Sequence, residues 1–227
     1  NKTSYRIDSL HAIVLNSSIS YHNQNSFFGV THYKSDQLNI YLNANHQWKW
    51  KQHQIISGAD FKVLDRNEII NFTDNLYDDD GLINKTYSGQ IKNENIVGIY
   101  TENNFSWNNG NTQLLTGLRL DRHNKYGVMF TPRTLLKHNF NENTILRASI
   151  GTGWRTVNLF SEHPHILGTN KNIFINPDLK PEKALNYGFN LLKSIYSEDF
   201  EIQLTLDVYK TQFLNQIYPD FYTNSVE

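Results

Sequence analysis

Hydrophobic and polar residues alternate with a period of two over much of this chain. Between 202 and 209, Ile, Leu, Leu and Val occupy the even positions, and Gln, Thr, Asp and Tyr occupy the odd ones. The same alternation occurs at 38–45 and 113–121. Because successive side chains of a strand point to opposite faces, each segment predicts a β-strand with one apolar and one polar face. The pattern leaves open whether the apolar face meets lipid or a second sheet.

Short polar turns and longer connections follow one another along the chain. Short turns are predicted at 49–52, 108–111, 141–143 and 197–199, and longer connections at about 22–36, 67–89, 123–127 and 155–184. This order is typical of outer-membrane barrels, which have tight periplasmic turns and extended outer loops. A soluble sandwich with Greek-key crossings has no reason to keep it. The predicted strands, roughly 11–18 residues long, exceed the usual soluble strand and suffice to cross a membrane when tilted.

Aromatic residues gather beside the short turns. In a membrane barrel they would form a girdle at one interface, whereas in a soluble protein they would pack at the ends of hairpins. The residues are Trp48, Trp50, Trp107, Phe140, Tyr196 and Phe200. We therefore expect the apolar positions, with Leu118, Leu204 and Leu206 among them, to face hydrocarbon.

Composition excludes several classes of protein. The 227 residues include no cysteine, which excludes a disulfide scaffold and thiolate metal sites. A net charge of −1 leaves no electrostatic footprint for nucleic acid. No apolar run approaches the roughly 18 residues of a spanning helix. The first residues lack the apolar region of a signal peptide and the last do not read as a finished strand, so we expect a fragment.

The segment from Gly151 to Glu182 carries the most specific pattern. Gly151 and Gly153 indicate a bend where a strand ends, and Trp154 and Arg155 follow them. Proline cannot donate to a β-ladder, so the prolines of the 176–182 stretch indicate that the long connection ends before a strand beginning near residue 184.

In this order and spacing, a series of motifs resembles the C-terminal barrel of the TonB-dependent outer-membrane receptors. The resemblance covers residues 90–218 well and 34–66 loosely. The motifs are Gly98-Ile99-Tyr100, Gly117-Leu118-Arg119-Leu120-Asp121, Thr131-Pro132-Arg133, Leu146-Arg147-Ala148-Ser149, Gly151-Thr152-Gly153-Trp154-Arg155 and Leu179-Lys180-Pro181-Glu182. The resemblance implies an all-β fold, an antiparallel transmembrane β-barrel of the 22-strand type. Residues 1–227 would form one incomplete arc of about nine strands, with the plug domain and the closing strands absent.

The resemblance also implies a function. The whole receptor would be an active transporter in the outer membrane of a Gram-negative bacterium, and not an enzyme. It would import a ferric siderophore, haem, cobalamin, another metal chelate or a glycan. Its partners would be a TonB-type energy-transducing protein acting through the missing plug, outer-membrane lipid, the small nutrient ligand and a possible surface lipoprotein, with no nucleic acid and no cofactor.

Charged residues in the predicted strands are the candidate site. A charge on the lipid face costs roughly 2–4 kcal/mol at the midplane, so charged residues are expected to face the lumen, the substrate or the plug. These candidates are Arg119, Asp121, Arg133, Arg147, Arg155 and Glu182.

The sequence evidence for a metal site or a catalytic site is weaker. His163 and His165 lie near Glu162 in the long connection and are weak metal-ligand candidates, because their spacing is not a zinc signature. The acidic run at 78–81 lacks the alternating spacing of a calcium loop. The sequence contains no nucleophile elbow, phosphate loop or zinc-protease motif. Two alternatives remain: a secreted, soluble β-sandwich module that binds glycans, and a β-rich glycosidase fragment, which the missing acid pair disfavours.

Overall fold

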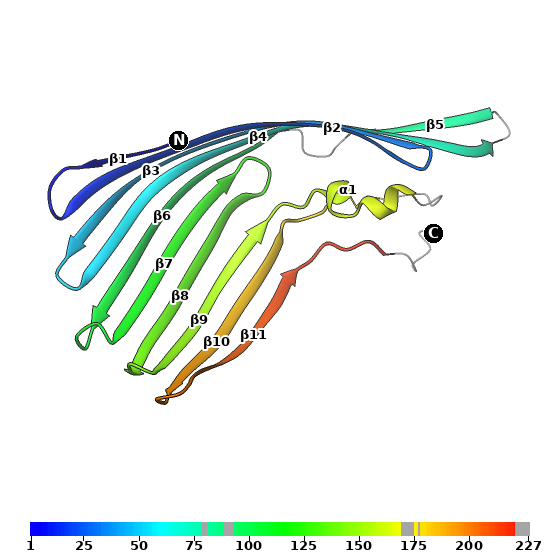
Figure 1. The fold of residues 1–227 in the computed structure, drawn as a ribbon. Coiled ribbons are helices and arrows are strands. Elements are labelled where there is room, and N and C mark those ends of the chain that lie inside the picture. Colours follow the sequence, from blue (N-terminus) through cyan, green and yellow to red (C-terminus); the bar gives the residue numbers. More distant parts are fainter. Residues whose placement is uncertain (79–80, 89–92, 169–174, 177, 221–227) are drawn as a thin grey trace.

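The computed structural model describes residues 1–78, 81–88, 93–168, 175–176 and 178–220, and the side chains of all of these except 72–78 and 81–88. Most of the chain is antiparallel strand (Figure 1). The strands are β1 (Lys2–Arg6), β2 (His11–Phe28), β3 (Thr31–Trp50), β4 (His53–Asp78), β5 (Gly81–Ser88), β6 (Asn93–Trp107), β7 (Thr112–His123), β8 (Gly127–Asn141), β9 (Thr144–Arg155), β10 (Glu182–Tyr196) and β11 (Glu201–Asn215). Two short helices, α1 (Leu159–Glu162) and the 3₁₀ helix η1 (Pro164–Gly168), lie between β9 and β10.

The described strands form a single sheet in the order β1-β2-β3-β4-β6-β7-β8-β9-β10-β11, with β5 paired to β4 off this path. The sheet curves into an open trough, and α1 lies on its concave side (Figure 1). An all-β antiparallel arc is therefore confirmed, and the described strands do not form the two packed sheets of a sandwich. The strands number eleven instead of about nine, because β1 and β5 were not counted.

The two faces of the sheet have opposite character, and the register shows it directly. One row of paired positions from β2 to β7 is polar or glycine: Asn16, Asn43, Asp60, Gly98 and Asp121. The adjacent row, on the other face, is apolar: Leu15, Ala44, Ala59, Ile99, Leu120 and Phe130. Leu118, Leu204 and Leu206 are exposed on this apolar outer face, with 51%, 56% and 55% of their surface accessible. We call the concave, mostly polar side the lumen face.

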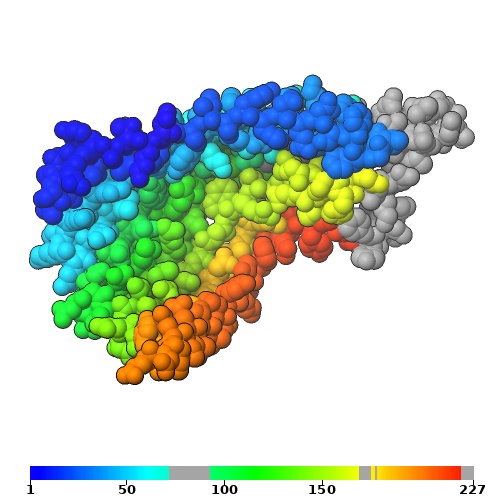
Figure 2. Space-filling model, in the orientation of Figure 1, coloured from blue at the N-terminus to red at the C-terminus, as the bar shows by residue number. Residues whose placement is uncertain are grey.

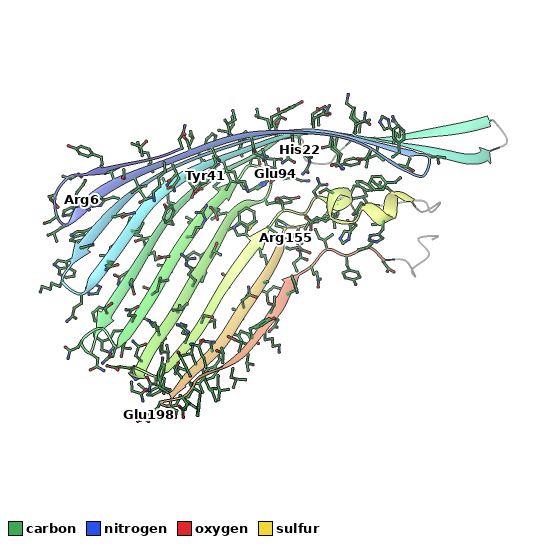
Figure 3. All side chains as sticks on the ribbon, in the orientation of Figure 1. Arg6, His22, Tyr41, Glu94, Arg155 and Glu198 are labelled. Carbon is green, nitrogen blue, oxygen red and sulfur yellow. The ribbon has the colours of Figure 1, made fainter. Side chains whose placement is uncertain are left out.

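The four short turns predicted from the sequence lie at one end of the trough, and most occupy their predicted positions. The loops 108–111 and 142–143 connect β6 to β7 and β8 to β9. Lys51, Asn108 and Asn109 adopt φ 53°, and Gly110 adopts φ 88°, as tight hairpins require. Figure 3 shows Arg6 and Glu198 near this end and Arg155 toward the opposite end.

Aromatic rings line the outer face at the short-turn end. Trp48, Trp50, His53, Phe105 and Trp107 stack in sequence, with neighbouring ring centroids 4.5–6.0 Å apart. We call these five residues the aromatic belt. Its position and direction are those of the predicted girdle.

Two other members of the predicted girdle behave differently from each other. Phe140 contacts His138 edge-on, with centroids 4.6 Å apart. Tyr196 follows Ile195, which continues the outer face, so alternation places Tyr196 on the lumen side.

Two predicted long connections are wrong. Strands β2 and β3 continue through 22–36 and leave only Gly29 and Val30 between them. The polar residues that predict a loop here bond across the hairpin instead: Asn23 and the adjacent Tyr21 both donate to Asp36. In 67–89, β4 extends to Asp78 and pairs with β5. These hairpins project beyond the rest of the wall (Figure 1), and an outer face that lies beyond the lipid can carry polar residues.

The long connection from β9 to β10 folds onto this projecting wall. Phe160 of α1 and Leu167 of η1 pack on Tyr33 and Ile70 of the lumen face, and these four side chains are at most 3% exposed. Figure 2 shows this segment between the β2–β3 hairpin and the segment that follows β11. Strand β10 begins at Glu182, two residues before the predicted start. Within the described residues, neither helix is long and apolar enough to cross a membrane.

Candidate functional site

Every charged side chain predicted for the site lies on the lumen face or at the rim opposite the short turns, which we call the upper rim. Each of these side chains has a polar partner there. The positions follow from strand alternation: Leu118, Leu120, Pro132 and Phe130 face outward, so Arg119, Asp121 and Arg133 face inward.

Arg119 of β7 is the centre of the best-buried group. Its guanidinium donates to Asp60 of β4 through two bonds of 2.6 and 2.9 Å and to Asp121 through a bond of 2.9 Å. The two carboxylates are 2% and 4% exposed, against 35% for the guanidinium side chain. Tyr100 lies under the guanidinium at 5.8 Å from its ring centroid. Two buried carboxylates therefore depend on one cation for charge compensation.

A glycine makes this group possible. Gly98 lies opposite Asp60 and Asp121 in the register. A Cβ on Gly98 would come within 2.5 Å of the Arg119 Nη2, 2.6 Å of Asp121 and 2.9 Å of Asp60. The absent side chain leaves the space in which the guanidinium lies flat on the sheet.

Arg133 and Arg147 are placed closer to the short-turn end. Arg133 of β8 pairs with Glu102 of β6, and with 65% of its side chain exposed it is open to the lumen. Arg147 of β9 donates to Asn190 at 2.8 Å, and Asn190 donates to Asp207 at 2.7 Å. These pairs cross from β6 to β8 and from β9 to β11.

Arg155 joins the two ends of the long connection. It donates to Glu182 at the start of β10 and pairs with Glu162 of α1, both at 2.8 Å. Glu182 is 5% exposed and also accepts from the amide of Ile217 at 2.9 Å. The Arg155 guanidinium thus joins the strand exit to α1 and to the start of β10, and Glu182 links the segment after β11 to them.

A second buried group, not predicted from the sequence, lies beside Arg155. The Nδ1 of His123 accepts the amides of Lys125 and Tyr126, so the ring proton of the neutral form is assigned to Nε2. That nitrogen faces Glu94 at 3.5 Å, and Glu94 accepts from the Thr156 hydroxyl at 2.9 Å. His123 is 1% exposed. Thr156, the first residue of the long connection, is thereby hydrogen-bonded to β6.

Trp154 connects the two groups, since its indole donates to Asp121 at 3.1 Å and its ring contacts His123 edge-on. Together they border an open cavity of about 490 Å³ on the lumen face. Its lining includes Tyr41, Asp60, Lys62, Arg119, Asp121, Trp154 and Arg155. Cations, carboxylates and aromatic edges meet here, which suits a polar ligand or a polar protein surface.

Sequence reasoning did not select Asp60, Glu94 or Trp154 as members of these groups. Asp60 and Glu94 are carboxylates at lumen-face positions of alternating strands, so the same parity argument that selected Asp121 applies to them. Their pairing with particular cations depends on strand order across the sheet.

The structure adds little support for the two weaker candidate metal sites, the His163–His165 pair and the acidic run at 78–81. The rings of His163 and His165 contact each other edge-on with centroids 5.9 Å apart. Among the described residues, no three His, Asp or Glu side chains are grouped as metal ligands. The acidic run at 78–81 lies largely outside the described residues.

The comparison with protein families agrees with this geometry. The sequence model of the family described as "TonB dependent receptor-like, beta-barrel" matches residues 1–227. This chain belongs to the TonB-dependent receptor family. The match covers the whole arc, so the predicted resemblance to the barrel of these receptors is confirmed.

Individual proteins are also similar to this chain in sequence or in fold. The chain is 30% identical, over 107 residues, to the iron-regulated outer membrane virulence protein of Vibrio cholerae, which is 46% of this chain and 16% of that protein. Its fold resembles the copper transporter OprC, with a TM-score of 0.58 at 15% identity over 91% of this chain and 37% of that one. It also resembles the ferric enterobactin receptor PfeA, with a TM-score of 0.54 at 14% identity over 91% of this chain and 36% of that one.

The chain thus spans about a sixth of the curated relative and somewhat over a third of these solved chains. Members of the family are receptors and transporters in the outer membrane of Gram-negative bacteria, and this chain is an outer-membrane protein of that kind.

Proposed function

We propose that this chain forms part of the barrel wall of a TonB-driven receptor that imports a scarce nutrient across the outer membrane. Residues 1–227 would act as one unit of that wall, with transport as its role instead of catalysis. The observation that supports the proposal most directly is the inward-facing charged network on an arc whose outer face is apolar. A lipid-embedded wall around an aqueous or protein-filled interior has this division of side chains.

The network has two regions, and we propose a different role for each. Arg119, Asp121, Arg133 and Arg147 lie on the spanning part of the wall, where they would contact a plug inside the barrel. Arg155 and Glu182 lie at the upper rim beside the cavity, where they would hold the long connection in place around the ligand path.

An iron chelate is the first ligand class we propose. One relative is named as iron-regulated and one solved neighbour as a ferric enterobactin receptor, while another is named as a copper transporter. Ferric siderophores are often anionic, and the three cations that line the cavity, Lys62, Arg119 and Arg155, outnumber its two carboxylates, Asp60 and Asp121, which would favour such a ligand. Haem, cobalamin, other metal chelates and glycans are the outcomes against which this choice is tested.

The test is a transport assay in a Gram-negative strain that lacks its own receptors and carries this protein. Uptake of radioactive iron is measured with a panel of siderophores, with haem, and with labelled cobalamin. We expect saturable uptake of at least one iron chelate, abolished by deletion of tonB or by an uncoupler. Equal uptake with and without TonB would contradict the proposal.

The rim residues are tested in the same assay with Arg155→Gln. Loss of charge-assisted bonds worth about 1.5–3 kcal/mol corresponds to a roughly ten- to hundredfold weaker ligand affinity if they order the ligand path. Arg122→Gln is the matched control, because Arg122 lies in the row of Phe61 and Val97 on the outer face. The amount of each variant at the cell surface is measured as well. Equal ligand affinity of the Arg155 variant and the wild type would show that Arg155 does not order the ligand path.

A further inference from the structure

Two histidines meet on the outer face at the short-turn end, next to the aromatic belt. His11 of β2 pairs with Trp48 in the register, and His46 of β3 pairs with Ile13, so the two histidines are diagonal neighbours on the same face. Their rings are nearly parallel, at an interplanar angle of 7° with centroids 5.1 Å apart. The Nδ1 of His11 lies 3.0 Å from the Nε2 of His46. Two ring nitrogens thus face each other at close range without a third residue between them.

We propose that His11 and His46 form a two-imidazole site for a divalent transition metal, with Cu²⁺ or Ni²⁺ preferred over Zn²⁺. Imidazole nitrogens bind such metals at about 2.0–2.1 Å. Two nitrogens 3.0 Å apart then subtend an angle of about 91–97° at the metal. This is close to the right angle of square-planar or tetragonal coordination, the geometry of Cu²⁺ and Ni²⁺, and smaller than the tetrahedral angle that Zn²⁺ adopts.

Metal binding needs a proton shift and a rotation of the two rings. In the metal-free pair one of the two facing nitrogens carries the hydrogen that the other accepts, so the lone pairs point along the line between the two nitrogens. When a metal binds, that proton moves to the other nitrogen of the same ring, and the two rings turn so that both lone pairs point to the metal. Each ring stays neutral, so no net proton is released from a pair that is neutral at the start.

The surroundings favour a cation. Asp8, in the turn before β2, accepts the amides of Leu10 and His11 at 2.7 and 2.8 Å. A carboxylate therefore lies beside the two imidazoles. The described residues supply no group of three ligands, so the other coordination positions would be taken by water.

Other histidines of this end are engaged differently, and they provide controls. His53, a member of the aromatic belt, lies 3.2 Å from the Asn103 side-chain oxygen. His138 lies 2.8 Å from the Thr112 hydroxyl. Each has a side-chain hydrogen-bond partner that is not an imidazole, although both lie on the same face and at the same end of the sheet.

A bound metal would cross-link β2 to β3 where the two strands approach the short-turn end. This inference rests on the geometry of one strand pair and does not depend on the nutrient proposed above. Failure of the uptake assay would leave it untouched, and its own failure would leave the uptake proposal untouched.

The test is Cu²⁺ titration of the purified protein in detergent, free of any oligohistidine tag, followed by electron paramagnetic resonance. We expect one Cu²⁺ with hyperfine splitting from two nitrogens in the wild type. In His11→Asn and in His46→Gln we expect the two-nitrogen signal to disappear and the Kd to rise by more than the roughly 10- to 100-fold that loss of an outer-shell partner costs.

The controls are His53→Asn and His138→Asn, which should keep the signal and the wild-type Kd. Folding of every variant is checked by its heat-dependent migration on a gel, which reports an intact barrel without metal. The proposal is overturned if His11→Asn and His46→Gln bind Cu²⁺ as the wild type does, or if Zn²⁺ binds the wild type more tightly than Cu²⁺ and Ni²⁺.

Discussion

At the scale of the residue, glycines decide where long side chains lie on the lumen face. Gly98 leaves room for Arg119, and Gly117 and Gly151 flank Arg133, where an added Cβ would come within 3.0 Å of that side chain. Gly153 also lies in a strand, but an added Cβ there meets nothing within 4 Å. The glycines therefore differ in role although their sequence contexts look alike.

We predict that Gly98→Ala lowers the free energy of unfolding by about 1–3 kcal/mol, because the new methyl group forces apart Arg119 and its two carboxylates. Gly153→Ala should be neutral or slightly stabilising, since it adds no clash and restricts the unfolded chain. Urea unfolding in detergent measures both. Equal stability of the two variants would show that the cluster tolerates the methyl group.

Burial separates two arginines that the sequence makes equivalent. Arg119→Met leaves Asp60 and Asp121 buried without a cation, and we expect a loss of about 3 kcal/mol or more. Arg133→Met breaks an ion pair whose arginine is 65% exposed, so the loss should stay within about 1 kcal/mol. The same unfolding measurement compares them. A larger loss for Arg133 would contradict the burial argument.

At the scale of the element, the long connection is held by packing and not only by its ion pairs. Phe160 is 3% exposed against Tyr33 and Ile70, while its neighbour Ser161 is exposed. Such a short helix has little stability of its own, so its place depends on this contact.

We therefore predict that Phe160→Ala releases the 156–168 segment from the wall, at a local cost of about 3–5 kcal/mol. Hydrogen exchange of the α1 and η1 amides should become faster, while exchange in β7 and β8 stays unchanged. Ser161→Ala is the control and should leave the exchange as it is. Unchanged protection in Phe160→Ala would mean that Arg155 alone holds the connection.

At the scale of the whole molecule, the curved sheet separates two solvents. Ile150 and Ser149 are neighbours in β9, yet Ile150 continues the outer face and Ser149 the lumen face. Both are exposed, so packing against protein does not distinguish them. What distinguishes the two positions is the medium that each face of the sheet contacts.

Ile150→Arg should lower the free energy of unfolding in lipid vesicles by roughly 2–4 kcal/mol, whereas Ser149→Arg should change it by less than about 1 kcal/mol. Unfolding in urea, followed by tryptophan fluorescence, gives both values. If the two substitutions cost the same, the outer face would not be in contact with hydrocarbon.

The sequence by itself determined most of the strands and their two faces. These features follow from a period of two that is local to each strand, which puts Leu118 on one face of the sheet and Arg119 and Asp121 on the other. The motifs from Gly98 to Glu182 were enough to indicate the family, which the match over the whole chain confirms. The projecting hairpins were missed because polar residues in paired strands beyond the lipid carry the same signal as a loop.

The tertiary structure alone decided which charges pair. Asp60 reaches Arg119 across a separation of 59 residues, and Thr156 reaches Glu94 across 62. Such contacts depend on the order and register of strands in the sheet, and no local pattern encodes them. The docking of Phe160 and the approach of His11 to His46 have the same origin, because each needs two strands or segments to be brought side by side.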